Sequence, residues 1–135
     1  RMTLKQIIST YSKQEIEVNE PSILIRINQK FRYSMKEIEL YDFTRGQWKI
    51  NTERAKKAKY AFAVYEGIIQ EVYTVLFWLE AGKTLNTRNE TDSAKDRFEF
   101  IGNIAEPEIR NKYKYKSVEH YFRKGNANPI LYVNC

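Results

Sequence analysis

The sequence comprises 135 residues, of which 42% are hydrophobic and 14% aromatic, and its formal net charge is +6. This length and composition predict one folded α+β domain and argue against disorder, and no apolar run reaches the roughly 18 residues that a membrane-spanning helix needs. A single cysteine, Cys135, excludes an internal disulfide and, with no secretory signal, indicates the cytoplasm. Because the chain begins with Arg1, we expect it to be a domain of a longer protein.

The first third of the chain predicts a helix, a connector and a strand. Leu4, Ile7, Ile8 and Tyr11 follow helical spacing. Residues 15–20 contain three acidic residues and are followed by Pro21, which indicates a connector. Ile16 and Val18 alternate with the acidic residues, so a short edge strand is also possible there. Residues 22–28 alternate, with isoleucines on one face and Leu24 on the other. We therefore expect residues 1–20 to form a helix and connector, and residues 21–135 to form a single domain.

The middle of the chain predicts two short helices and a hairpin. The pattern Ser34-Met35-Lys36-Glu37 has the form of a capping box. Asn51 is the expected N-cap of a helix that continues to Lys59. Residues 60–65 and 68–79 are rich in β-branched and aromatic residues, and the turn residues 66–67 separate them. Close spacing predicts that these two strands pair as an antiparallel hairpin.

The last third predicts a polar loop, two strands and two more short helices. The mobile loop covers residues 81–96, and strands cover 97–104 and 130–134. Pro107 suits the first turn of a helix, and Ser117 is expected to cap another that stops at Gly125. About five strands and three or four short helices predict an α+β domain on a small, curved antiparallel sheet or partly closed barrel. This order of elements resembles the PUA-like barrels, the group that includes ASCH, EVE and YTH modules.

Positive charge is concentrated in two segments. Residues 45–59 and residues 110–124 each hold six basic residues against one acid, so the rest of the chain is net negative. Two basic segments that meet on one face would attract a polyanion. The alternative is two ordinary solvated helix faces.

Trp48 lies between Arg45 and Lys49, a pattern that suits stacking on a base while cations hold phosphates. The alternative places Trp48 in the core with its charged neighbours in solvent. We expect the two basic segments to adjoin and frame this indole. The predicted nucleic-acid contacts are Arg45, Trp48, Lys49, Arg54, Lys56, Lys57, Lys59, Tyr65, Trp78, Lys112, Lys114, Lys116, Arg123 and Lys124.

The sequence predicts no catalytic residue, metal ligand or cofactor. His120, the only histidine, sits among aromatic residues, which suits a structural role better than that of a general base. Glycines are too few and scattered for a phosphate-binding loop. Glu66 and Glu71, which flank the expected hairpin turn, and Glu99 on a later strand leave one alternative open: a small metal-dependent nuclease whose carboxylates converge in the fold.

Five stretches together resemble a bacterial domain from the C-terminal part of GIY-YIG-type nuclease-like proteins. They are Ile25–Asn28, Glu39–Lys49, Tyr60–Tyr73, Phe98–Gly102 and Asn128–Asn134. The resemblance spans residues 22–135, and the paired motifs of the nuclease itself are absent. It implies an accessory domain that targets or binds rather than cleaves.

The functional prediction is therefore a non-catalytic nucleic-acid-binding module, with DNA as the favoured nucleic acid. A nuclease domain in the same polypeptide is the further expected partner, and no membrane is expected. A protein-interaction domain is the first alternative, and the small nuclease is the second.

Overall fold

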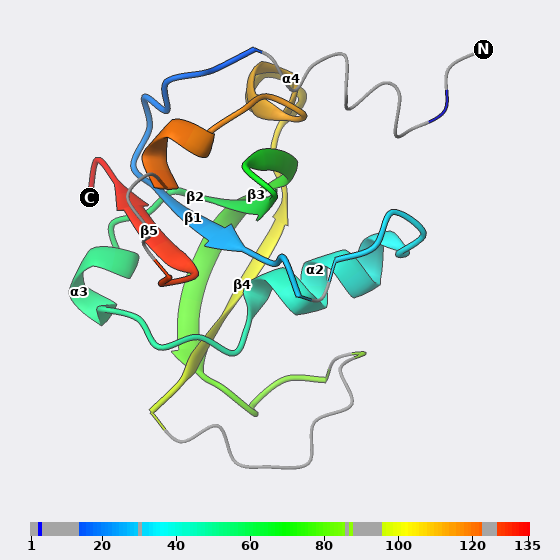
Figure 1. Cartoon of the computed structure of the whole chain (residues 1–135). Coiled ribbons are helices and arrows are strands. Elements are labelled where there is room, and N and C mark those ends of the chain that lie inside the picture. Colours follow the sequence, from blue (N-terminus) through cyan, green and yellow to red (C-terminus); the bar gives the residue numbers. More distant parts are fainter. Residues whose placement is uncertain (1–2, 4–13, 30, 86, 88–95, 123–126) are drawn as a thin grey trace.

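The computed structural model describes residues 3, 14–29, 31–85, 87, 96–122 and 127–135, which form an α+β fold around a five-stranded sheet (Figure 1). The strands are β1 (Ser22–Arg26), β2 (Tyr60–Tyr65), β3 (Ile68–Glu80), β4 (Phe98–Ile104) and β5 (Ile130–Val133). The helices are α2 (Glu37–Arg45), α3 (Thr52–Ala55) and α4 (Pro107–Tyr113), and a 3-10 helix covers Glu119–Phe122. None of the described helices is long and apolar enough to cross a bilayer.

The sheet is mixed and open, with strand order β4-β3-β2-β1-β5. β1 pairs with β2 in parallel, whereas the β1–β5, β2–β3 and β3–β4 pairs are antiparallel. The prediction of a fully antiparallel sheet is therefore wrong at its centre. The chain between β1 and β2 contains α2 and α3, and such a long crossover is what parallel pairing requires.

Both faces of the sheet are covered. One cluster contains Leu24, Phe62 and Val72 from the sheet and Tyr113 from α4, and the other contains Ile23, Ile25 and other residues on the α2 side. Figure 1 shows α4 and α2 on opposite sides of the strands. β1 is consequently buried on both faces, so the expectation that Leu24 faces away from the core is wrong. The alternation of residues 22–28 separates two buried layers instead of a core from solvent.

The predicted hairpin is confirmed. Glu66 and Gly67 have φ angles of 49° and 79°, the conformation of a two-residue type I′ turn. Beyond this turn β3 changes partner: Ile68 to Thr74 pair with β2, and Tyr73 to Glu80 pair with β4. The outer half of β3 therefore extends past β2 and forms a two-stranded arm with β4 (Figure 1).

The helix boundaries confirm some capping predictions and correct others. Asn51 caps α3, since its side chain accepts a hydrogen bond from the Arg54 amide (3.2 Å), but α3 ends at Ala55 rather than Lys59. The predicted Ser34 capping box is wrong. Helix α2 begins at Glu37, and the carboxylate of Glu39 accepts a hydrogen bond from the backbone of Lys36 (3.0 Å).

The later elements agree with the sequence where they are described. β4 and β5 form as expected, Pro107 opens α4, and Ser117 Oγ accepts a weak hydrogen bond from the Glu119 amide (3.4 Å). The expected helix at residues 4–11, most of the loop at 81–96 and the stop at Gly125 lie outside the described residues. The connector packs onto the domain, because Val18 joins the core cluster of α4.

Candidate nucleic-acid interface

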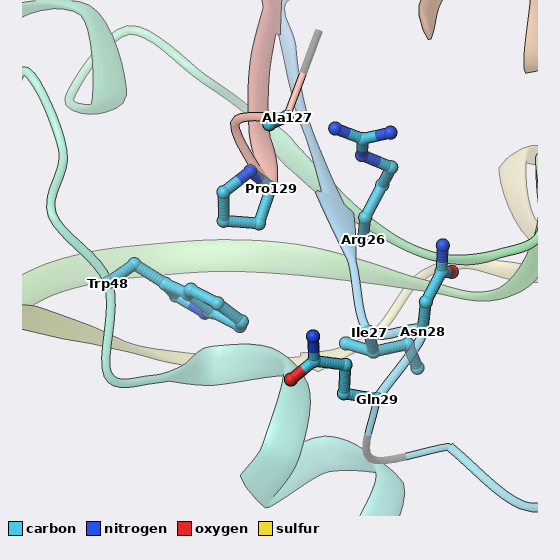
Figure 2. A pocket seen from close by; sticks show the side chains of 7 residues that line it. All are labelled: Arg26, Ile27, Asn28, Gln29, Trp48, Ala127 and Pro129. Atoms are coloured by element: carbon cyan, nitrogen blue, oxygen red, sulfur yellow. The ribbon is translucent and has the colours of Figure 1, made fainter. Parts of the chain in front are cut away.

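Trp48 forms one wall of an open pocket of about 370 Å³ (Figure 2). It lies in the segment between α2 and α3, and its backbone pairs with Phe98 of β4 through two hydrogen bonds of 3.0 and 2.8 Å. The indole Nε1–H donates to the carbonyl of Thr44 (2.7 Å). These three bonds fix a ring that remains partly exposed, so Trp48 neither fills the core nor swings freely.

The other walls come from the end of β1 and the residues that precede β5. Ile27 and Pro129 are apolar, and the exposed amide of Gln29 points toward the indole (Figure 2). The Asn28 side chain is fixed by the hairpin turn, because its Oδ1 accepts a hydrogen bond from the Glu66 amide (2.9 Å). We refer to Trp48, Ile27, Gln29 and Pro129 as the Trp48 cleft.

Arg26 borders the cleft without facing the indole. Its guanidinium donates to the carbonyl of Asn128 (2.8 Å) and lies 4.7 Å from the centroid of the Phe122 ring. Sequence reasoning identified Trp48 but not Arg26, Asn28, Gln29 or Pro129. The available signal was the run of polar residues directly after a buried strand.

The first basic segment leaves several cations in solvent. The exposed lysines, called the lysine group below, are Lys49, Lys56, Lys57 and Lys59. Arg54 is held against β5: its guanidinium stacks 4.4 Å above the Tyr132 ring and donates to the carbonyl of Cys135. Tyr132 of β5 lies three residues after Pro129 in the chain, or roughly 10 Å at the rise of a strand. The start of α3 is therefore close to the Trp48 cleft.

Arg45 does not belong to this surface. Its side chain is 3% exposed, and it donates to Asp42 (2.9 Å), to Thr84 (2.7 Å) and to the carbonyl of Leu85 (2.8 Å). The carboxylate of Glu99 lies 3.7 Å from the same guanidinium. The predicted contact of Arg45 with a base or phosphate is therefore wrong, because a buried ion pair of this kind holds the guanidinium inside the protein.

The second basic segment is largely paired within the protein. Arg110 forms a two-pronged ion pair with Glu71 (2.8 and 2.9 Å), and Lys114 approaches the same carboxylate at 3.3 Å. Lys112 lies 3.4 Å from Glu20. Lys116 donates to the backbone carbonyl of Lys112 (3.2 Å). Three of the four described basic residues of this segment, Arg110, Lys112 and Lys114, are thus paired with carboxylates.

The two basic segments do not frame the indole. α4 packs in one core cluster and Trp48 in the other, so the sheet separates them. The segments approach each other at the start of β1, where Lys59 bonds through its backbone to the carbonyl of Pro21 (2.7 Å) and Lys112 pairs with Glu20. The expectation that both segments adjoin at Trp48 is therefore wrong.

Two of the remaining predicted contacts have packing partners, and the other two lie outside the described residues. Trp78 packs against Phe100, with ring centroids 5.2 Å apart, and its Nε1 is buried. Tyr65 is partly buried against Phe31, with centroids 4.7 Å apart. Trp78 is partly exposed, as Trp48 is, so its contact with a ligand stays a prediction. Arg123 and Lys124 lie outside the described residues.

Glu71 and Glu99 do not converge into a metal site. Glu99 pairs across the sheet with Leu79, eight residues along β3 from Glu71, which corresponds to roughly 26 Å. Each carboxylate also belongs to a different ion pair. Within the described residues, no group of three His, Cys, Asp or Glu side chains is placed to hold a metal ion. This separation removes the pair on which the nuclease alternative depended.

Comparison with known proteins adds no family to this description: no family model, curated protein or solved structure matches the chain. The fold and the site thus define an α+β domain with an open mixed sheet, an aromatic cleft at the end of β1, and exposed lysines in and around α3.

Proposed function

We propose that this domain is a non-catalytic nucleic-acid-binding module, with DNA as the favoured ligand. The observation that supports the proposal best is the position of Trp48, which is fixed, partly exposed and followed in the chain by the lysine group. Exposed lysines supply affinity for phosphates without sequence preference, and a partly exposed indole adds stacking. The resemblance to accessory domains of GIY-YIG-type proteins and to PUA-like modules belongs to this same proposal.

The test is binding of the 135-residue chain to short single-stranded and duplex DNA across a salt series. If all four lysines neutralise phosphates, the slope of log K against log salt is about −4 for duplex and about −3 for single strands. Replacing Lys56→Ala and Lys57→Ala together reduces the magnitude of the duplex slope by about 2.

The matched control is the pair Lys36→Ala and Lys83→Ala, two exposed lysines at the start of α2 and after β3. This pair removes the same charge but leaves the slope unchanged. A wild-type slope that corresponds to fewer than about three phosphates contradicts the proposal. If both pairs of substitutions reduce the slope equally, the binding is a general effect of net charge and the proposed lysine surface is wrong.

A protein-interaction domain remains the second candidate, because three apolar side chains of β3 and β4 are exposed. Leu76 and Phe77 on β3 are 55% and 53% exposed, and Ile104 on β4 is 42% exposed. Exposed apolar side chains that form one contiguous patch often mark contacts with other proteins. Under this candidate, nucleic-acid binding is absent and Phe77→Ser abolishes association with the partner, whereas the lysine pair has no effect.

A further inference from the structure

We infer that the Trp48 cleft receives one unpaired base, so that the domain selects single-stranded nucleic acid over duplex. This inference rests on the proposed nucleic-acid binding and adds the part of the ligand that the cleft contacts. The cleft volume of about 370 Å³ is at the lower end of the range for small-molecule sites. It suits a single planar ring system that slides against the indole.

The chemistry of the walls matches a base in three respects. Trp48 offers an indole face, and Ile27 and Pro129 complete an apolar slot (Figure 2). Gln29 directs an amide into the slot, and an amide supplies a donor and an acceptor side by side, the arrangement that base edges present. A base within a duplex has both faces stacked and its pairing edge occupied, so only an unpaired base meets all of these groups.

The orientation of the indole is set before any ligand arrives. The bond from Nε1 to the Thr44 carbonyl and the pairing of Trp48 with Phe98 hold the ring in place. A rigid stacking platform loses little conformational entropy when a ligand binds. We assign the phosphate contact of the same nucleotide to Lys49, because it is exposed and directly follows Trp48 in the chain.

The experiment compares strands that have the same phosphates but differ in their bases. The probes are single-stranded oligo(dT), an abasic single strand of the same length, and a duplex of that length, with oligo(rU) as the RNA arm. The wild-type chain is expected to bind oligo(dT) on the order of tenfold more tightly than the abasic strand, because stacking one base contributes about that factor. Trp48→Leu is expected to bind both strands equally and to leave duplex affinity unchanged.

A second measurement protects the test against misfolding of the Trp48 variant. In a Trp78→Phe background Trp48 is the only tryptophan, and its fluorescence is expected to be quenched by oligo(dT) but not by the abasic strand or the duplex. Gln29→Ala changes an exposed side chain and is expected to reduce the preference for oligo(dT) over the abasic strand severalfold. Tighter binding of oligo(rU) than of oligo(dT) assigns the unpaired base to RNA.

The outcomes separate this inference from the proposed function. Salt-dependent binding of all strands without preference for bases overturns the cleft inference alone. A Trp48→Leu variant that weakens both single strands equally overturns it as well, since Trp48 is then only a structural residue. Absence of salt-dependent binding to any strand overturns the proposed function and the inference together.

Discussion

Glu71 is a buried carboxylate whose charge is held by three partners, and it predicts how stability depends on pH. Burial raises the pKa of Glu71, but the hydrogen bonds from Arg110 and from the Val72 amide, with the charge of Lys114, outweigh burial and lower the pKa overall. A carboxylate whose pKa is lowered by folding stabilises the folded state above its unfolded pKa, near 4.3 for Glu. That stabilisation is lost as the pH falls through the folded pKa.

We therefore expect Glu71→Gln to lower the free energy of unfolding at pH 7 by about 1.5–3 kcal/mol, the range for hydrogen bonds to charged groups. The difference from wild type narrows as the pH falls below about 4, because protonation then removes the same charge from the wild-type protein. Urea unfolding across pH measures this difference. Glu53→Gln on α3, an exposed site, is the control and shows little difference at any pH. If the difference in unfolding free energy between Glu71→Gln and wild type does not shrink at acidic pH, the charge of Glu71 is not its source.

Arg45 shows at the same scale what the sequence could and could not predict. Asp42 precedes it by three residues on α2, a spacing at which side chains meet, so a local ion pair was predictable. The proximity of Glu99 to Arg45 depends on tertiary packing, because Glu99 lies on β4, far from Arg45 in the sequence. Counting Arg45 as an exposed cation therefore failed because charge in a sequence does not report burial.

At the scale of elements, the β2–β3 hairpin was predictable because its signals are local. Two β-rich runs separated by two turn residues specify an antiparallel pair, whatever the rest of the chain does. The parallel pairing of β1 with β2 was not predictable in this way, because more than thirty residues, including α2 and α3, separate the strands. The Trp48 cleft shares this limit, because its walls come from Ile27, Trp48 and Pro129 and only the mixed sheet brings them together.

Two glycines with positive φ angles allow backbone strain to be measured separately from steric crowding by a neighbouring element. Gly67 has φ +79°, and a Cβ built on it lies 2.7 Å from Cβ of Glu119, whereas Gly82 has φ +91° and a Cβ there meets nothing within 4 Å. We expect Gly82→Ala to cost about 1–2 kcal/mol from left-handed strain alone. Gly67→Ala is expected to cost at least about 1 kcal/mol more, because the 3-10 helix that contains Glu119 must move. Thermal or urea unfolding of the two variants measures both costs. Equal losses of unfolding free energy would show that a Cβ at Gly67 does not crowd the 3-10 helix.

At the scale of the whole molecule, net charge does not identify the binding surface, because the two basic segments differ in how they are paired. Lys56 and Lys57 are exposed without a neighbouring carboxylate among the contacts described, whereas Lys112 and Lys114 lie within 3.4 Å of Glu20 and Glu71. A cation already paired within the protein releases few counterions when it meets a phosphate. The sequence placed equal charge in both segments and could not distinguish them.

We therefore expect Lys112→Gln and Lys114→Gln together to leave the slope of log K against log salt almost unchanged. The same pair is expected to lower the free energy of unfolding slightly, since it removes the partners of Glu20 and Glu71 in ion pairs that are partly exposed. The pair Lys56→Gln and Lys57→Gln gives the opposite result: the slope for duplex DNA falls in magnitude by about 2 while stability stays the same. Binding titrations at several salt concentrations and urea unfolding of both double variants measure the two effects. If the α4 pair reduces the slope as much as the α3 pair does, then phosphates compete successfully with Glu20 and Glu71, and the binding surface extends around the edge of the sheet to α4.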